Sequence, residues 1–153
     1  MAQQKEDIVI LMADDDDDDF LLTKKALQDS HLLNDLHRVK DGEDLLDYLN
    51  NEKKFSDKSM YPRPGIILLD LNMPRKDGRE ALKEIKSNPK LSSIPVVVFT
   101  TSKAEADIFK TYELGVNSFI TKPVTFDKLI DVMKTLGSYW FKIVTLPIDT
   151  MSV

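Results

Sequence analysis

The sequence predicts one α/β domain built on a doubly wound, five-stranded parallel sheet. Two observations lead to this prediction. Apolar, β-prone runs alternate along the chain with segments in which apolar residues recur at helical spacing. Two of these runs, at 8–13 and 66–69, are continuously apolar, as is usual for strands covered on both faces. Because crossovers between parallel strands are right-handed, few topologies remain.

The N-terminal half is expected to hold three of the strands. Leu22, Ala26 and Leu27 follow six consecutive aspartates, so a helix should start among the later aspartates, where its dipole favours negative charge. The expected elements are a strand at 8–13, a helix ending near Ser30, a strand at 36–39, a helix from 43 to about 51, a charged loop at 52–63 and a strand at 66–70.

The C-terminal half continues the alternation. Ser102 is expected to cap the fourth helix and Gly115 to end it. Five strands with five helices suit the order 2-1-3-4-5, the flavodoxin-like (βα)5 arrangement. The expected elements are a helix around 81–85 that ends by 88, a strand at 96–100, a helix over 104–114, a strand at 118–121 and a long helix from about 126 to near 141.

Composition narrows the classes of function. The chain has 153 residues with a net charge of −5, so nucleic acid and anionic membranes are not expected as direct partners. It has no cysteine, which excludes disulfides, thiolate metal sites and a cysteine nucleophile. No apolar run approaches the roughly 20 residues that a membrane span needs, and residues 1–7 lack a signal-peptide pattern. A cytoplasmic location is expected.

Polar side chains follow several of the expected strands. Asp14 and Asp15 come after the first strand and Asp70 ends the third, and in the order 2-1-3-4-5 these two strands are neighbours. Ligands bind at the carboxyl edge of such sheets. Carboxylates that converge there hold either a proton or a cation, and oxygen ligands select a hard ion such as Mg²⁺. Thr100 and Lys122, at the ends of the fourth and fifth strands, face the same edge.

These residue types together indicate phosphoryl chemistry. An aspartate carboxylate can accept a phosphoryl group, and its transfer depends mainly on positioning and charge neutralisation. Asp70 is therefore the candidate nucleophile, with Mg²⁺ and Lys122 offsetting the phosphoryl charge.

The same residues lie in motifs that resemble the CheY-like receiver domain of two-component response regulators, over roughly residues 8–136. The chain is most similar to the single-domain regulators that partner bacterial phytochromes, which share its Lys-Asp-Gly-Arg-Glu and Lys-Pro-Val segments and its aromatic tail. The motifs are Leu11-Met-Ala-Asp-Asp15, Leu68-Leu-Asp-Leu-Asn-Met-Pro74, Val97-Val-Phe-Thr-Thr-Ser102 and Phe119-Ile-Thr-Lys-Pro123.

The resemblance implies a role for each matching residue. Asp70 would be the phosphoacceptor, and Mg²⁺ would be bound by Asp14, Asp15, Asp70 and the backbone carbonyl of Asn72. The remaining roles are Thr100 moving toward the phosphoryl group, Phe119 following it as an aromatic switch, Lys122 pairing with the phosphoryl group, and Pro123 following a cis peptide.

The resemblance also implies the function: a stand-alone receiver that takes a phosphoryl group from a sensor histidine kinase, of the phytochrome type, or from a phosphotransfer protein. Phosphorylation would then switch a protein-interaction surface. Such a protein is not an enzyme beyond its own phosphorylation and dephosphorylation. Two alternatives stay open, namely an aspartyl-phosphate phosphatase of the haloacid-dehalogenase type and a receiver-like binding module that is never phosphorylated.

The run of aspartates permits register shifts. Counting back from the first helix selects Asp14 and Asp15 as the acidic pair, with Asp16 next, whereas 17–19 are expected to be a solvated helix start. An EF-hand is excluded, because Asp19 stands where that loop needs glycine and Lys25 where it needs glutamate.

The aromatic end of the chain allows two interpretations. The aromatic residues 139–141 suit either the core or an interface. The expected organisation is a disordered N-terminus at 1–7, a receiver domain at 8–141 and a tail at 142–153, and the apolar tail and last helix favour a homodimer or a partner contact.

Overall fold

A computed structural model describes residues 8–32 and 34–143, the last three of these by their backbone alone. Its sheet has five parallel strands in the order β2-β1-β3-β4-β5, which confirms the predicted topology. Within the described residues, no helix is long and apolar enough to cross a membrane.

The element bounds agree with the sequence to within a few residues. The strands are β1 (Ile10–Ala13), β2 (Leu36–Val39), β3 (Ile66–Leu69), β4 (Val96–Thr100) and β5 (Ser118–Thr121). The helices are α1 (Asp17–Asp29), α2 (Gly42–Leu49), α3 (Gly78–Ser87), α4 (Glu105–Leu114) and α5 (Phe126–Leu136), with a short 3-10 turn η2 (Lys53–Phe55) and a final π-helical turn η3 (Gly137–Ile143).

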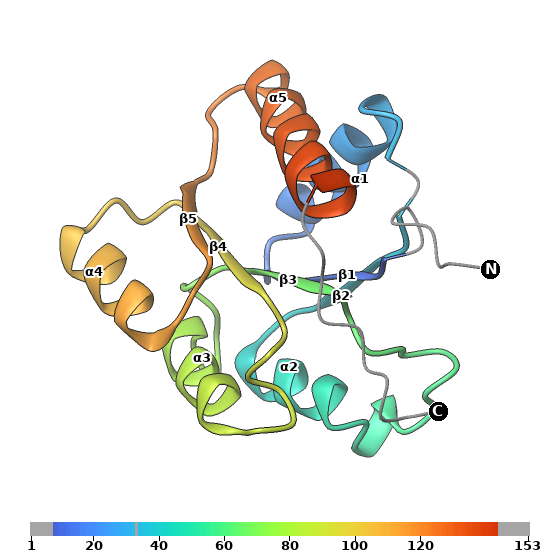
Figure 1. Ribbon diagram of the computed structural model, residues 1–153, viewed down its shortest axis with the longest axis vertical. Helices are drawn as coiled ribbons and strands as arrows, with labels where there is room; N and C mark the ends of the chain where they lie inside the picture. Colours follow the sequence, from blue (N-terminus) through green and yellow to red (C-terminus); the bar gives the residue numbers. More distant parts are fainter. Residues whose placement is uncertain (1–7, 33, 144–153) are drawn as a thin grey trace.

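Helices cover both faces of the sheet (Figure 1), with α1 and α5 on one side and α2, α3 and α4 on the other. The strand residues alternate between the two cores. On the α2–α3 side, Leu11, Ile67 and Val98 pack with Leu45 and Ile85.

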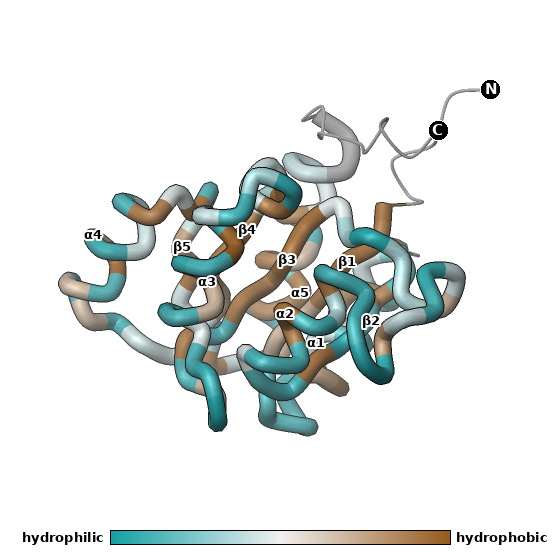
Figure 2. The backbone as a smooth tube through the Cα atoms, turned by 90° about the horizontal axis from the view of Figure 1, so that it is seen from below, coloured by the Kyte–Doolittle hydropathy of each residue, from teal (hydrophilic) through white to brown (hydrophobic). Residues whose placement is uncertain are grey.

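The second core is built in the same way. Met12, Leu68 and Phe99 pack against Leu27 of α1 and Met133 of α5. Because both faces of the central strands are buried, those strands are apolar throughout, as their hydropathy colours show in Figure 2. This burial explains why continuous apolar runs were a reliable strand signal.

The register of the sheet aligns the strand ends. Ala13 of β1 is paired with Leu69 of β3, so the residues that follow them, Asp14 and Asp70, leave the sheet at the same level. The Asp70 amide donates to the carbonyl of Ala13 at 3.0 Å. Between β4 and β5, the backbone amide of Lys122 donates to the carbonyl of Thr100 at 2.7 Å. The chemically reactive residues therefore share one edge.

Two sequence predictions are corrected by the backbone. The cap of α4 is Ala104 rather than Ser102, because the Ser102 hydroxyl donates to the Asp107 carboxylate at 2.8 Å and the helix begins after it. The prediction of a cis peptide before Pro123 is wrong in this structure, since no described peptide bond is cis. The trans form is the more stable one for most X–Pro bonds. With this bond trans, the Lys122 ammonium contacts the carboxylates of Asp14, Asp19 and Asp70.

The aromatic cluster near the end of the chain is divided between core and surface. Trp140 is buried with α1 and α5, whereas the side chain of Tyr139 is exposed. The expectations for 1–7 and for most of the tail fall on residues outside those that the structure describes.

Candidate functional site

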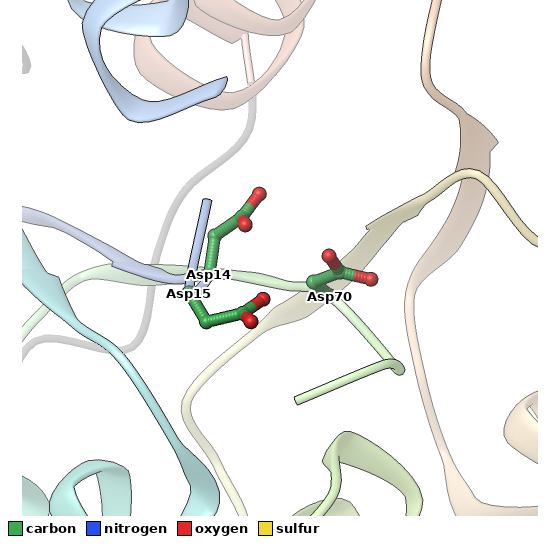
Figure 3. A group of neighbouring side chains, drawn as sticks. All are labelled: Asp14, Asp15 and Asp70. Atoms are coloured by element: carbon green, nitrogen blue, oxygen red, sulfur yellow. The ribbon is translucent and has the colours of Figure 1, made fainter. Parts of the chain in front are cut away.

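Three carboxylates gather at the carboxyl edge of the sheet (Figure 3). Asp14 and Asp15 follow β1 and Asp70 follows β3, and one oxygen from each lies within 4.8 Å of the others. Asp14 and Asp70 are buried, whereas Asp15 is exposed to solvent. The three acidic residues selected from the sequence are thus brought together.

The three carboxylates of this cluster repel one another when they are ionised. Two unit charges about 4 Å apart repel by roughly 4 kcal/mol at an effective dielectric constant near 20. Burial, and to a lesser degree the charge of Asp70, raise the pKa of the Asp14 carboxyl above its ordinary value. A bound cation would remove this repulsion, and a set of oxygen ligands suits a hard divalent ion.

Lys122 is the cation that the chain itself supplies. Its Nζ donates to Oδ2 of Asp14 at 2.7 Å, to Oδ2 of Asp19 at 2.6 Å and to Oδ2 of Asp70 at 3.0 Å. Only 8% of its side chain is exposed. Burial alone would lower the pKa of this ammonium, but the surrounding carboxylates raise it above its ordinary value, so Lys122 is charged.

The two oxygens of Asp70 have different partners. Oδ1 accepts from the Thr100 hydroxyl at 2.8 Å and from the Asn72 amide at 3.2 Å. Oδ2 faces Lys122. Thr100 is fully buried, so its hydroxyl has little freedom to point elsewhere without losing this bond.

Phe119 lies farther along the same side of the sheet. It is half-buried in β5 and packs against the core on the α2–α3 side. Its backbone amide donates to the Tyr112 hydroxyl of α4 at 3.2 Å. The residue therefore lies between the interior and the α4 surface.

The rest of the aspartate run has several distinct roles. Asp16 is the N-cap of α1, and its Oδ1 accepts from the amides of Asp18 and Asp19. Asp17 pairs with Arg38 at 2.7 Å, and Asp18 is exposed. Residues 17–19 start the helix and lie outside the acidic cluster, as expected, but Asp19 is partly buried and binds Lys122 rather than being simply solvated.

Arg38 is a second residue that the sequence reasoning missed. Its Nε donates to the backbone carbonyl of Asp14 at 2.9 Å, and its side chain is 12% exposed. Nothing local marks it, since the contact depends on β2 lying beside β1. Its effect is to fix the backbone at the acidic pair.

The arrangement can bind a cation and an anion side by side. Carboxylate oxygens of Asp14, Asp15 and Asp70 lie close enough together to bind one cation. The Thr100 hydroxyl and the Lys122 ammonium are donors directed at Asp70, and they suit a tetrahedral anion attached to that carboxylate.

Comparisons with known proteins agree with this geometry. Residues 10–134 match the protein family described as the response regulator receiver domain. The chain is 42% identical over 126 residues to the response regulator Rcp1 of Synechocystis sp., covering 82% of this chain and 84% of that protein.

Solved structures give the same answer. The crystal structure of the phosphorylated cyanobacterial phytochrome response regulator RcpA has 41% identity and a TM-score of 0.86, over 93% of this chain and 99% of that one. The response regulator RPA3017 in red light signalling of R. palustris has 31% identity and a TM-score of 0.87, over 92% of this chain and 99% of that one. An Mn²⁺-bound form of Rcp1 has 41% identity and a TM-score of 0.83, over 92% and 99%.

Proposed function

The chain belongs to the response regulator receiver family of two-component signalling, and on this premise we propose that Asp70 is its phosphoacceptor. The single observation that carries the proposal is the set of partners around this carboxylate: two acidic neighbours, a hydroxyl and an ammonium. In the transfer, a carboxylate oxygen of Asp70 forms a bond to phosphorus while the bond from phosphorus to the donor's leaving group breaks.

The proposed metal is Mg²⁺. Asp14, Asp15, Asp70 and the backbone carbonyl of Asn72 would hold it, and the Mn²⁺-bound form of Rcp1 supports a divalent ion at such a site. When bound, the ion supplies positive charge that offsets the phosphoryl oxygens. Without it, the positive charge in direct contact with Asp14 and Asp70 is the Lys122 ammonium.

Three residues of the chain would respond to the phosphoryl group. Lys122 would pair with it, and Thr100 would donate to it from the hydroxyl that now bonds Asp70. Phe119 would follow Thr100 inward and change the surface near α4, so that phosphorylation biases a two-state equilibrium.

The proposed phosphodonor is a sensor histidine kinase of the phytochrome type, or a phosphotransfer protein. This rests on the relatives named above, of which RcpA is a phytochrome response regulator and RPA3017 acts in red light signalling. We further propose a domain at 8–141, followed by a tail at 142–153 that contacts a partner or a second copy of the chain.

The test is phosphorylation by acetyl phosphate with Mg²⁺, followed by mass spectrometry. We expect incorporation of one phosphoryl group in the wild type and in Asp131→Asn, an exposed carboxylate of α5, and none in Asp70→Asn. Wild-type incorporation in Asp70→Asn would remove Asp70 as the acceptor. Steady turnover of a phosphomonoester would favour the phosphatase alternative, and a wild type that takes up no phosphoryl group would favour the binding module.

A further inference from the structure

Asp19 differs from the other two carboxylates that contact Lys122. Asp14 and Asp70 both belong to the acidic cluster proposed to hold the metal, and Asp19 does not. Its contact with Nζ is nevertheless the shortest of the three, at 2.6 Å. Lys122 is thus shared between the cluster and α1.

The fold holds Asp19 firmly in this place. Asp16 caps α1 and accepts from the Asp19 amide at 3.1 Å, which fixes the first turn of the helix. The Asp19 side chain is 33% exposed, whereas that of Lys122 is 8% exposed. The ammonium therefore reaches outward from the cluster to a carboxylate on a capped helix turn.

We propose that Asp19 is the positioning residue for Lys122, and that it holds the ammonium beside Asp70 while the other two carboxylates serve the metal and the phosphoryl group. This inference rests on the function proposed above. It gives the first turn of α1 a part in phosphoryl transfer, whereas the sequence alone indicated only a solvated helix start.

The geometry supports this through the donors of the ammonium. A lysine has three N–H donors, and each of the three carboxylates can take one. A cation bound to Asp14 and Asp70 would compete with the ammonium for these carboxylates and repel it. The bond to Asp19, which lies outside that cluster, escapes this competition, so it would keep the ammonium beside Asp70 while the other donors turn toward a phosphoryl oxygen.

Asp18 gives a matched control, because it is the preceding residue of the same run and is exposed. Asp18→Asn and Asp19→Asn remove the same charge from the same helix turn. With acetyl phosphate and saturating Mg²⁺, we expect Asp19→Asn to be phosphorylated about threefold to tenfold more slowly than Asp18→Asn. Equal rates in the two variants would overturn the proposal.

Repeating the pair in the Lys122→Met background separates positioning from a merely structural role. If Asp19 acts through Lys122, the difference between Asp19→Asn and Asp18→Asn disappears there. A difference of the same size in both backgrounds would overturn the proposal.

A spectroscopic measurement covers the case in which the Lys122→Met rate is too low to follow. The ¹⁵Nζ and ¹³Cε resonances of Lys122 should shift in Asp19→Asn and stay in place in Asp18→Asn, without any phosphodonor; unchanged resonances in Asp19→Asn would count against the contact. A wild type that is not phosphorylated at all would instead refute the proposed function, so the two failures are distinguishable.

Discussion

Arg79 of α3 and Asp107 of α4 form a two-point ion pair, with Nε 2.8 Å from Oδ1 and Nη2 2.7 Å from Oδ2. The Ser102 hydroxyl adds a third bond to Oδ2 at 2.8 Å. Arg79 also donates from Nη1 to the carbonyl of Leu71, the residue after Asp70, at 3.3 Å. One guanidinium therefore ties the loop of the proposed phosphorylation site to α4.

This ion pair should give the stability of the protein a specific pH dependence. The hydrogen bond from Arg79 lowers the pKa of Asp107 from 3.8 to about 2. Because the folded-state pKa is the lower one, the stabilisation is complete above about pH 4 and is lost as the pH falls toward 2. At pH 7, Asp107→Asn should lower the free energy of unfolding by about 2 kcal/mol.

Urea denaturation at pH 7 and pH 3 measures this effect. Glu105→Gln is the control, since Glu105 is an exposed carboxylate in the first turn of the same helix and should change stability by less than about 0.5 kcal/mol. The gap between wild type and Asp107→Asn should narrow at pH 3. A gap that stays constant with pH would show that the ion pair is not its source.

Gly78 should be intolerant of any side chain. A Cβ at this position would lie 2.7 Å from Cα of Leu71 and closer still to the carbonyl oxygen of Asp70. These are backbone atoms of the loop at the site, so relief requires the loop to move. Gly78→Ala should cost about 3 kcal/mol, measured by urea denaturation, and slow phosphorylation. Glu80→Ala, on the exposed side of α3, should do neither.

The sequence was sufficient for the parts of the site that follow from strand ends. Asp14, Asp70, Thr100 and Lys122 could be assigned to one edge because parallel strands in a known order must deliver them there. The apolar runs located the central strands because both faces of those strands are buried.

The contacts that were missed or mistaken depend on how helices pack. Asp19 looked like one more solvated aspartate, because its contact with Lys122 requires the α1 turn to lie beside the loop after β5. Ser102 looked like a helix cap, but the Asp107 carboxylate took its hydroxyl. In the second case the hydroxyl was taken by another local partner, five residues along the chain, and in the first case nothing in the local sequence signalled the contact.

Divalent metal should stabilise the protein through Asp15. At a Mg²⁺ concentration ten times the Kd, binding to the folded state alone adds about 1.4 kcal/mol to the free energy of unfolding. Asp15→Asn should remove most of this gain, because the exposed Asp15 carboxylate belongs to the acidic cluster. Asp18→Asn, which removes the same charge nearby, should keep it. Urea denaturation with Mg²⁺ and with EDTA measures the difference, and equal gains in both variants would exclude Asp15 as a ligand.

Thr100→Val should separate phosphorylation from its structural consequence. Valine has nearly the shape of threonine and suits this fully buried position, but it lacks the hydroxyl that donates to Asp70. We expect the variant to accept a phosphoryl group, because the acidic cluster and Lys122 are retained. The amide resonances of Phe119 and Tyr112 should then shift much less on phosphorylation than in the wild type.

Thr100→Ser is the matched control, because it restores the hydroxyl and removes only a methyl group. With the serine variant, the shifts at Phe119 and Tyr112 should return toward wild-type size, although the lost methyl should cost about 1 kcal/mol of stability. Full-sized shifts in Thr100→Val would mean that the signal reaches β5 without the hydroxyl. In that event Lys122, whose backbone amide is bonded to the carbonyl of Thr100, would be the connection to test next.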